Sequence, residues 1–235
     1  MFDRSQLIRN YIVVDRGTPH LRANFIASLD GAASFDGVSG PLNDTADKQV
    51  FDTLRMLSDV VLVGAGTLRT EDYGPLILDN DAVAWRVEHG LAPQPVLAIV
   101  SARLELDHSS DVFSRAPVRP LVFTQGGFHD GPPEGLAAVA DVEICGERSL
   151  DVAAMWAVLI RRGLTQVLTE GGPHLFGSLV AADAVDELCL TLSPVLAGGG
   201  AGRITAGSEP GLHAMRLAHV LTAGDMLMLR YVRSR

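Results

Sequence analysis

The 235-residue sequence predicts an α/β fold with a mostly parallel sheet, and two observations support this. Short runs of apolar, mainly β-branched residues alternate with helical patterns along most of the chain, and such runs are typical of strands buried on both faces. Near the end, residues 216–221 and 226–232 form two further strands separated by Ala223-Gly224-Asp225, which is a hairpin signal. Together these patterns indicate a parallel sheet with an antiparallel C-terminal edge, flanked by helices.

The first half of the chain supplies four of the expected strands. Residues 23–28 lack a helical period and end at the turn Asp30-Gly31, so they form the first strand. A helix follows from Asp44 or Thr45, either of which can cap it, and its apolar residues recur at i, i+1, i+4 and i+7 from Val50. The other three strands are expected at residues 60–63, 95–100 and 120–124.

The second half adds two helices and two strands before the hairpin. Gly163 is placed to end the first of these helices, and Pro173 suits the first turn of the second. No linker or internal repeat interrupts the pattern, so we expect one domain, residues 21–235, after an N-terminal extension, residues 1–20. The expected elements are a helix at 151–162, a strand at 166–169, a helix at 173–182 and a strand at 187–192.

Composition excludes several classes of function. The chain has 28 acidic residues against 19 Lys and Arg, a net charge of −9, which argues against a nucleic-acid-binding surface. Its two cysteines, Cys145 and Cys189, fit a reducing cytosol, and the histidines form no metal-binding motif. No apolar run approaches the roughly 20 residues that a membrane-spanning helix needs, and no secretory signal is present. We therefore expect a cytoplasmic protein with no metal, membrane or nucleic-acid partner.

Glycine is abundant, with 24 residues, and four glycines follow predicted strands directly. Gly64 and Gly66 follow the strand at 60–63, while Gly171 and Gly172 follow the strand at 166–169. Ligands of open α/β sheets bind beyond the carboxyl ends of strands, where glycine lets a phosphate approach the backbone N–H groups of a helix start. Two such loops suit the pyrophosphate of a dinucleotide; tight turns without a ligand are the alternative, since no complete G-x-G-x-x-G or Walker A motif occurs.

Three charged residues stand beside these loops. Asp30 follows the first strand and is either a turn residue or part of a site. Glu170 ends a buried strand and needs a partner, either a ligand with N–H donors or a neighbouring arginine. Arg55 lies on the helix after Leu54 and is either a solvated charge or a ligand-binding group.

Three segments in this order resemble the reductase domain of bacterial riboflavin biosynthesis, which has a dihydrofolate-reductase-like fold. They are residues 28–31, residues 59–67, and residues 170–173 followed by Val185-Asp186-Glu187-Leu188 and Pro194. The resemblance extends over about residues 21–232. It implies an NADPH-dependent reductase that transfers a hydride to the ribosyl C1′ imine of a ribosylaminopyrimidine phosphate, of the 5-amino-6-ribosylaminouracil phosphate type. The deaminase fused to many members is absent here.

The resemblance also implies the residues of the site. Ser39, Arg55 and Glu170 would bind the heterocyclic substrate, with Glu170 holding ring N–H groups and Asp30 delivering a proton or orienting a water molecule. Ser101, with Arg103, would lie near the adenosine 2′-phosphate. The cofactor positions would be Ala27, Pro41, Gly64, Gly66, Thr67, Glu71, Ser101, Gly171, Gly172, Pro173, His174, Leu175 and Phe176.

Two departures from the family pattern leave the substrate open. The family commonly has a base soon after the Asp-Gly turn, where this chain has Ala32-Ala33, and residues 76–84 contain no counterpart of a second substrate-binding arginine. Both would be natural phosphate ligands. A dihydrofolate or pterin reductase, or a catalytically silent NADPH-binding protein, are therefore alternatives. The family is usually dimeric, and residues 217–229 supply an apolar strand pair for a homodimer interface.

Overall fold

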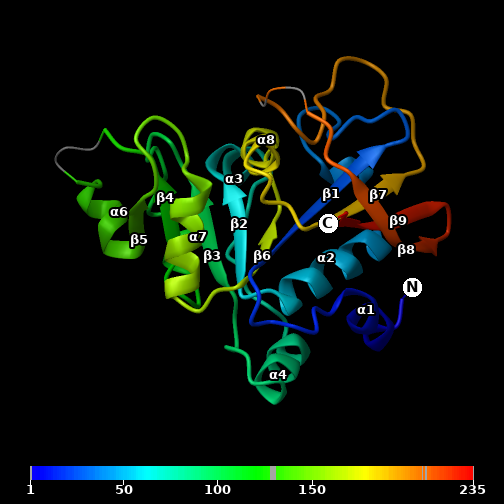
Figure 1. The fold of residues 1–235 in the computed structure, drawn as a ribbon, viewed down its shortest axis with the longest axis horizontal. Helices are drawn as coiled ribbons and strands as arrows, with labels where there is room; N and C mark the ends of the chain where they lie inside the picture. The colour runs from blue at the N-terminus through cyan, green and yellow to red at the C-terminus, as the bar shows by residue number, and fades with distance from the viewer. Residues whose placement is uncertain (1, 128–130, 208, 210, 235) are drawn as a thin grey trace.

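Nine strands form one sheet in the computed structural model, which describes residues 2–127, 131–207, 209 and 211–234. Their order across the sheet is β5-β4-β3-β2-β6-β1-β7-β9-β8 (Figure 1). Strands β1 to β7 pair in parallel, and β9 and β8 close the sheet as an antiparallel hairpin. The strands are β1 (His20–Ser28), β2 (Val60–Gly64), β3 (Val96–Val100), β4 (Leu121–Thr124), β5 (Asp141–Ile144), β6 (Gln166–Thr169), β7 (Glu187–Ser193), β8 (Met215–Ala223) and β9 (Met226–Arg233).

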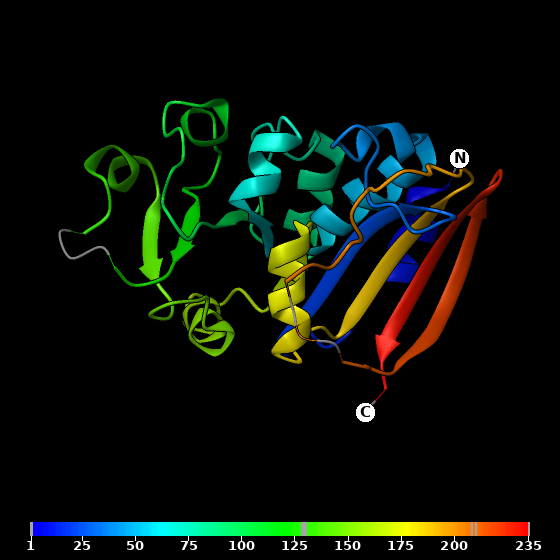
Figure 2. The same cartoon turned by 90° about the horizontal axis from the view of Figure 1, so that it is seen from above.

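Helices cover both faces of this sheet (Figure 2). The longest, α2, runs across β1 and β7, while α7 and α8 lie on the opposite face (Figure 1). The helical elements are α1 (Arg4–Tyr11), the 3-10 turn η1 (Gly40–Leu42), α2 (Thr45–Leu57), α3 (Ala65–Thr70), α4 (Asn80–Glu88), α5 (Asp111–Ser114), α6 (Glu134–Val139), α7 (Val152–Arg161) and α8 (Pro173–Ala181).

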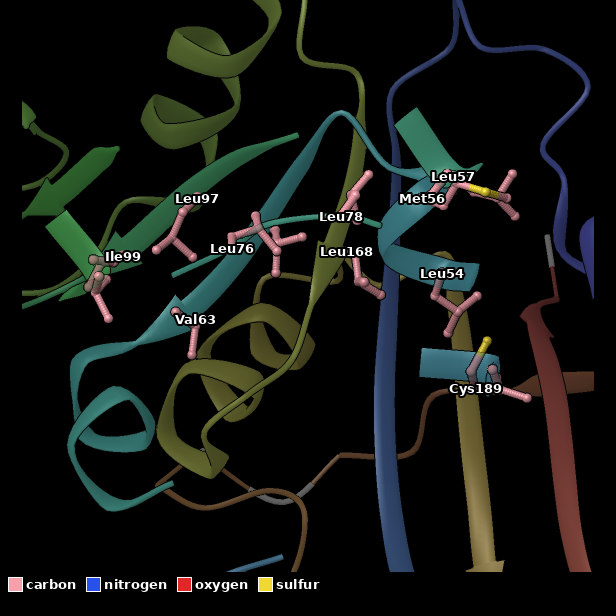
Figure 3. Close-up of a cluster of buried hydrophobic side chains, with 14 of the residues drawn as sticks. Leu54, Met56, Leu57, Val63, Leu76, Leu78, Leu97, Ile99, Leu168 and Cys189 are labelled. Carbon is pink, nitrogen blue, oxygen red and sulfur yellow. The ribbon is translucent and has the colours of Figure 1, made fainter. Parts of the chain in front are cut away.

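The alternation of side chains along β2 explains the two hydrophobic cores. Val61 and Val63 point to the core under α1, α2 and α4, whereas Val60 and Leu62 point to the core under α7 and α8. Because successive residues of a strand face opposite sides, a strand covered on both faces must be apolar throughout, as this one is. Figure 3 shows the first core, where Leu54 of α2 packs near Leu168 and Cys189 of the sheet.

Local signals set the ends of the predicted elements. The Asp44 carboxylate accepts hydrogen bonds from the backbone N–H groups of Ala46 and Asp47, so it caps α2 as predicted. Asp151 caps α7 in the same way, and Gly163 follows that helix with a φ of 72°, a conformation that favours glycine. The predicted strands and helices are confirmed with ends that differ by a few residues, the largest difference being the earlier start of β1.

The structure adds elements that the sequence patterns missed. Strand β5, helices α1, α4, α5 and α6 and the 3-10 turn η1 were not predicted; β5 is a four-residue edge strand of mixed polarity. The proposed N-terminal extension includes α1, whose Leu7 and Tyr11 are buried in the core beside α2. The boundary at residue 20 stays a prediction, but residues before it contribute to the same core. Every helix among the described residues is too short or too polar to cross a membrane.

Candidate active site

The two glycine loops meet at the carboxyl ends of neighbouring strands. Strands β2 and β6 pair in parallel, and the backbone N–H of Gly64 donates to the carbonyl oxygen of Gly171 at 2.7 Å. In addition, the N–H of Glu170 donates to the carbonyl oxygen of Leu62 at 3.0 Å. Loops about a hundred residues apart in the chain therefore form one surface, as the strand-end pattern predicts.

Glycine is required where these loops touch. A Cβ on Gly172 would lie 2.4 Å from Oγ1 of Thr67, and a Cβ on Gly171 would lie 2.9 Å from the Phe25 ring. Gly171 also has a φ of 89°, which side chains disfavour. In contrast, a Cβ on Gly66 would meet nothing within 4 Å, because this residue faces a cavity.

Two cavities share a wall at this edge of the sheet. One, of about 580 Å³, lies over the ends of β2 and β3 and the start of α8, and we call it the cofactor cavity. The other, of about 480 Å³, lies between α2, β1 and the segment after α3, and we call it the substrate cleft. Thr67, Gly172 and Pro173 line both. The two cavities therefore lie next to each other at this edge of the sheet.

Most of the predicted cofactor residues line the cofactor cavity. The cavity also contains three bases, Arg69, Arg103 and Arg148, and one carboxylate, Glu105, which lies 3.7 Å from the Arg103 guanidinium. Arg69 and Arg148 were not foreseen, because nothing in their local sequence separates them from solvated charges. The predicted residues found here are Gly64, Gly66, Thr67, Ser101, Gly172, Pro173, His174 and Leu175.

Five predicted cofactor residues lie elsewhere. Ala27 is buried in β1, and Pro41 is an exposed residue of η1; neither lines a described cavity of this site. Phe176 packs on the Phe25 ring at 4.5 Å between centroids, and so turns away from the cofactor cavity. Gly171 contributes its carbonyl oxygen, which accepts the hydrogen bond from the N–H of Gly64 in β2. Glu71 lines the substrate cleft instead.

Glu71 and Ser39 form one polar corner of the substrate cleft. The Glu71 carboxylate accepts hydrogen bonds from the backbone N–H of Ser39, at 3.0 and 3.2 Å, and from its hydroxyl at 3.1 Å. This contact holds the loop after β1 against the segment after α3. Two residues predicted separately, one for substrate and one for cofactor, are therefore neighbours at the cleft.

Arg55 and Glu170 form a buried ion pair in the substrate cleft. Arg55 Nε and Nη2 donate to the two Glu170 carboxylate oxygens at 2.6 and 2.7 Å, and the side chains are only 17% and 4% exposed. Of the two alternatives for Glu170, the structure thus shows the neighbouring arginine. Arg55 is not a solvated helix charge, since its guanidinium also stacks on the Phe51 ring at 4.1 Å.

Tyr73 completes this network and was missed by sequence reasoning. Its hydroxyl accepts from Arg55 Nη2 at 2.6 Å and donates to a Glu170 oxygen. Burial and the Glu170 carboxylate raise the pKa of Tyr73 well above its usual value, so the hydroxyl keeps its proton. Burial opposes the Arg55 charge, but the Glu170 carboxylate outweighs it and raises the pKa of the guanidinium. The guanidinium therefore keeps its charge at neutral pH.

Asp30 does not have the position expected of a proton donor. Its carboxylate is exposed and accepts hydrogen bonds from the Ser28 hydroxyl and from the backbone N–H groups of Ala197 and Gly198, at 3.1 and 2.8 Å. These bonds, first that of Ser28, lower the pKa of Asp30 to about 2. Asp30 thus anchors the loop after β7. An ionised carboxylate has no proton to give, and its role in orienting a water molecule stays a prediction.

The substrate cleft also contains residues that no motif marked. Asn24 of β1 and Asp47 and Lys48 of α2 line it together with the ion pair. Asp47 is 5% exposed, whereas the Lys48 side chain is 66% exposed and pairs with Asp52 at 3.1 Å. Lys48 is thus a base at the cleft, although the two segments in which the family has its bases contain none in this chain.

Comparison with known proteins identifies the family. A family model described as the RibD C-terminal domain matches residues 19–229, which is most of the chain. The chain belongs to this family. Membership confirms the resemblance seen in the sequence and makes the chain a reductase that works with a reductant cofactor.

Curated relatives of the RibD C-terminal domain family carry two names. A 2,5-diamino-6-ribosylamino-4(3H)-pyrimidinone 5′-phosphate reductase of Archaeoglobus fulgidus is 26% identical over 208 residues, which are 88% of this chain and 94% of the relative. One of the same name from Methanothermobacter thermautotrophicus is 25% identical, covering 91% and 97%. The riboflavin biosynthesis protein RibD of Mycobacterium tuberculosis (strain ATCC 25618 / H37Rv) is 28% identical over 78% of this chain, which spans only 44% of that protein.

Solved structures of the RibD C-terminal domain family share this fold. A pyrimidine reductase-like protein from Corynebacterium diphtheriae superposes over the full length of both chains with a TM-score of 0.88 and 26% identity. RibD of Acinetobacter baumannii has a TM-score of 0.74 and 20% identity, over 93% of this chain and 59% of that protein. The mostly parallel sheet with its antiparallel hairpin, predicted from the sequence, is confirmed.

Proposed function

We propose that this chain is an NADPH-dependent reductase of a ribosylaminopyrimidine 5′-phosphate in riboflavin biosynthesis. The substrate class is the one named for the archaeal relatives, or its deaminated 5-amino-6-ribosylaminouracil counterpart. The observation that carries the proposal is that the two cavities adjoin and have three lining residues in common, because hydride transfer requires cofactor and substrate to be bound next to each other. When bound, NADPH supplies that hydride.

The cofactor cavity fits a phosphorylated dinucleotide. The backbone N–H groups at the start of α8 suit a pyrophosphate, and glycine at position 172 keeps the wall thin, since a Cβ there would strike Thr67. Arg69, Arg103 and Arg148 place an excess of positive charge in the same cavity as Ser101. These bases favour the 2′-phosphate that distinguishes NADPH from NADH.

The substrate cleft fits a heterocycle with N–H groups. The Glu170 oxygens already accept three hydrogen bonds, two from Arg55 and one from Tyr73, and a carboxylate has about four acceptor sites, so one remains for a ring N–H group. Because Arg55 is engaged with Glu170, its role is to orient that carboxylate, and Lys48 is the base at the cleft left for a phosphate.

The charge of the substrate cleft supports a second candidate, a pterin or folate-type reductase. Four carboxyl groups and two bases line this cleft, an arrangement that disfavours an anionic phosphate. A catalytically silent NADPH-binding protein is the remaining alternative. NADPH oxidation should therefore be followed with the diaminopyrimidinone phosphate, the aminouracil phosphate and dihydrofolate in parallel. Turnover of a pyrimidine phosphate supports the proposal, turnover of dihydrofolate alone supports the second candidate, and cofactor binding without turnover supports the third.

The choice of cofactor has its own test. Arg103→Ala and Arg148→Ala should each weaken NADPH binding by about tenfold, measured by calorimetry, and leave NADH binding unchanged, because each removes a charged contact to phosphate of about 1.5–3 kcal/mol. Arg115→Ala is the matched control, since Arg115 is an exposed base paired with Asp111 away from both cavities. Equal weakening of NADPH and NADH binding would contradict the assignment.

We also propose a cytoplasmic homodimer. The outer face of the β8–β9 hairpin is apolar, with Val220 43% and Leu227 37% exposed, and β8 is the last strand of the sheet (Figure 2). Exposed apolar edges of this kind are normally covered. Sedimentation should give a dimer for the native chain and a monomer for Val220→Glu; a monomeric native chain would refute this part.

A further inference from the structure

Asp47 is a carboxyl group of the substrate cleft for which the proposed function has no role so far. It lies in the first turn of α2 and lines the cleft beside Asn24 and Phe51, yet it is only 5% exposed. Acidic residues are almost never buried to this extent without a partner. The first question is therefore what compensates this group.

No base compensates Asp47 among the residues that the structure describes. Neither base of the cleft pairs with Asp47: Lys48 lies beside Asp52 in an exposed ion pair, and Arg55 is held by Glu170. Asp47 occupies the third position of the helix, where an acidic side chain often accepts a hydrogen bond from the N–H of the capping residue. No such bond is found in the described part of α2; the neighbour that lowers the pKa of the Asp47 carboxyl is instead the Thr191 hydroxyl on β7.

The surroundings of Asp47 favour its protonated form. Burial raises the pKa of Asp47, the Thr191 hydroxyl lowers it, and the nearby Asp44 carboxylate raises it, so that the balance lies above the ordinary value. From β1 the neighbour in the cleft is the uncharged Asn24. The other titratable groups around the same cleft are Lys48, Arg55, Glu71, Asp72, Tyr73 and Glu170.

The proposed reaction needs a proton as well as a hydride. The carbon of the C=N bond takes the hydride, the π electrons move to nitrogen, and that nitrogen must take a proton to become a secondary amine; the imine is reduced and the nicotinamide is oxidised. Asp30 is ionised and exposed, and Glu170 is held by Arg55. The other two carboxyl groups of the cleft are Glu71, which accepts hydrogen bonds from Ser39, and Asp72, which is exposed. Asp47 is the remaining carboxyl group; it is buried, and no base among the described residues pairs with it.

We propose that Asp47 donates this proton to the substrate nitrogen. This inference rests on the proposed function, and Asp47 then regains its proton from solvent after product release. Thr191 and Asp44 are positioning residues that set the acidity of the donor without touching the reacting atoms. General acids in such positions contribute about 100-fold to 10,000-fold to rate.

Asp47→Asn is the decisive variant, because it preserves shape and polarity but cannot transfer a proton. Single-turnover NADPH oxidation with the pyrimidine substrate should slow by about 100-fold or more. The native rate should fall as pH rises through the pKa of Asp47, and the variant should lack this step. Asp44→Asn should move this step to lower pH, because asparagine still caps the helix while one negative charge near Asp47 is lost. Thr191→Val should move it to higher pH.

A second measurement is independent of activity. In protein labelled with [4-¹³C]aspartate, the Asp47 carboxyl resonance is the one that disappears in Asp47→Asn. In the native chain this resonance should titrate with a pKa above the ordinary aspartate value of about 3.9. The proposal is overturned by a native-like pH profile in Asp47→Asn, by a resonance that titrates normally, or by a rate that rises with pH. If the native chain fails to oxidise NADPH with any of the C=N substrates, the proposed function and this inference are overturned together. If the native chain turns over a substrate and Asp47→Asn is equally active, the inference alone is overturned.

Discussion

Replacing Gly172 with alanine tests the close contact of the two strand-end loops. The backbone at Gly172, with φ −74° and ψ −174°, suits alanine, so any effect comes from the new methyl group. That group would lie 2.4 Å from Oγ1 of Thr67, about 1 Å closer than ordinary contact. Overpacking of this kind costs about 1–3 kcal/mol. For a chain of this length, roughly 3 °C per kcal/mol corresponds to a fall in Tm of about 3–9 °C.

Calorimetric unfolding and NADPH titration measure the two consequences. We expect the lower Tm together with at least about tenfold weaker NADPH binding, because Gly172 and Thr67 both line the cofactor cavity. Gly66→Ala is the control, since its methyl group meets nothing within 4 Å; its Tm should equal or exceed the native value, as alanine is the better helix former by about 1 kcal/mol. Gly172→Ala combined with Thr67→Ala should recover much of the lost stability. A native Tm for Gly172→Ala, or no recovery in the double variant, would refute the reasoning.

Three further predictions concern the charged groups. Glu170→Gln leaves the buried Arg55 charge without its carboxylate and should lower the free energy of unfolding by about 3–5 kcal/mol in urea, whereas Tyr73→Phe should cost only about 1 kcal/mol; equal costs would contradict the ion pair. Burial raises the pKa of Glu187, but Arg22, His20 and Arg230 outweigh burial and lower it. The ionised carboxylate therefore stabilises the fold above about pH 4, and this contribution is lost as pH falls through the lowered pKa. In Glu187→Gln, the free energy of unfolding should therefore depend less on pH in the acidic range. Asp30→Asn should leave the activity profile between roughly pH 5 and 9 unchanged in shape, since Asp30 titrates near 2.

Strand and helix positions were predictable because their signals are local. The run at residues 60–63 is apolar because both faces of β2 are covered, and Asp44 and Asp151 mark helix starts because each bonds to N–H groups two or three residues away. The missed elements have weaker local signals. Strand β5 is an edge strand of mixed polarity, and α4 has in its last turn a buried Arg86 that donates to the carbonyl oxygens of Met56 and Ser58.

The sequence by itself determined the fold class, the family and the two glycine loops, since these depend on patterns read over a few neighbouring residues. Only the tertiary structure decided which charges face one another. Arg55 meets Glu170 across 115 positions of the chain, and Tyr73 reaches the same pair from a third segment. Likewise, Asp47 has the local sequence of an ordinary first-turn acid, and only the tertiary structure buries it at the cleft. The physical reason is that ionisation and hydrogen bonding depend on what surrounds a group in space, which residues near it in sequence do not specify.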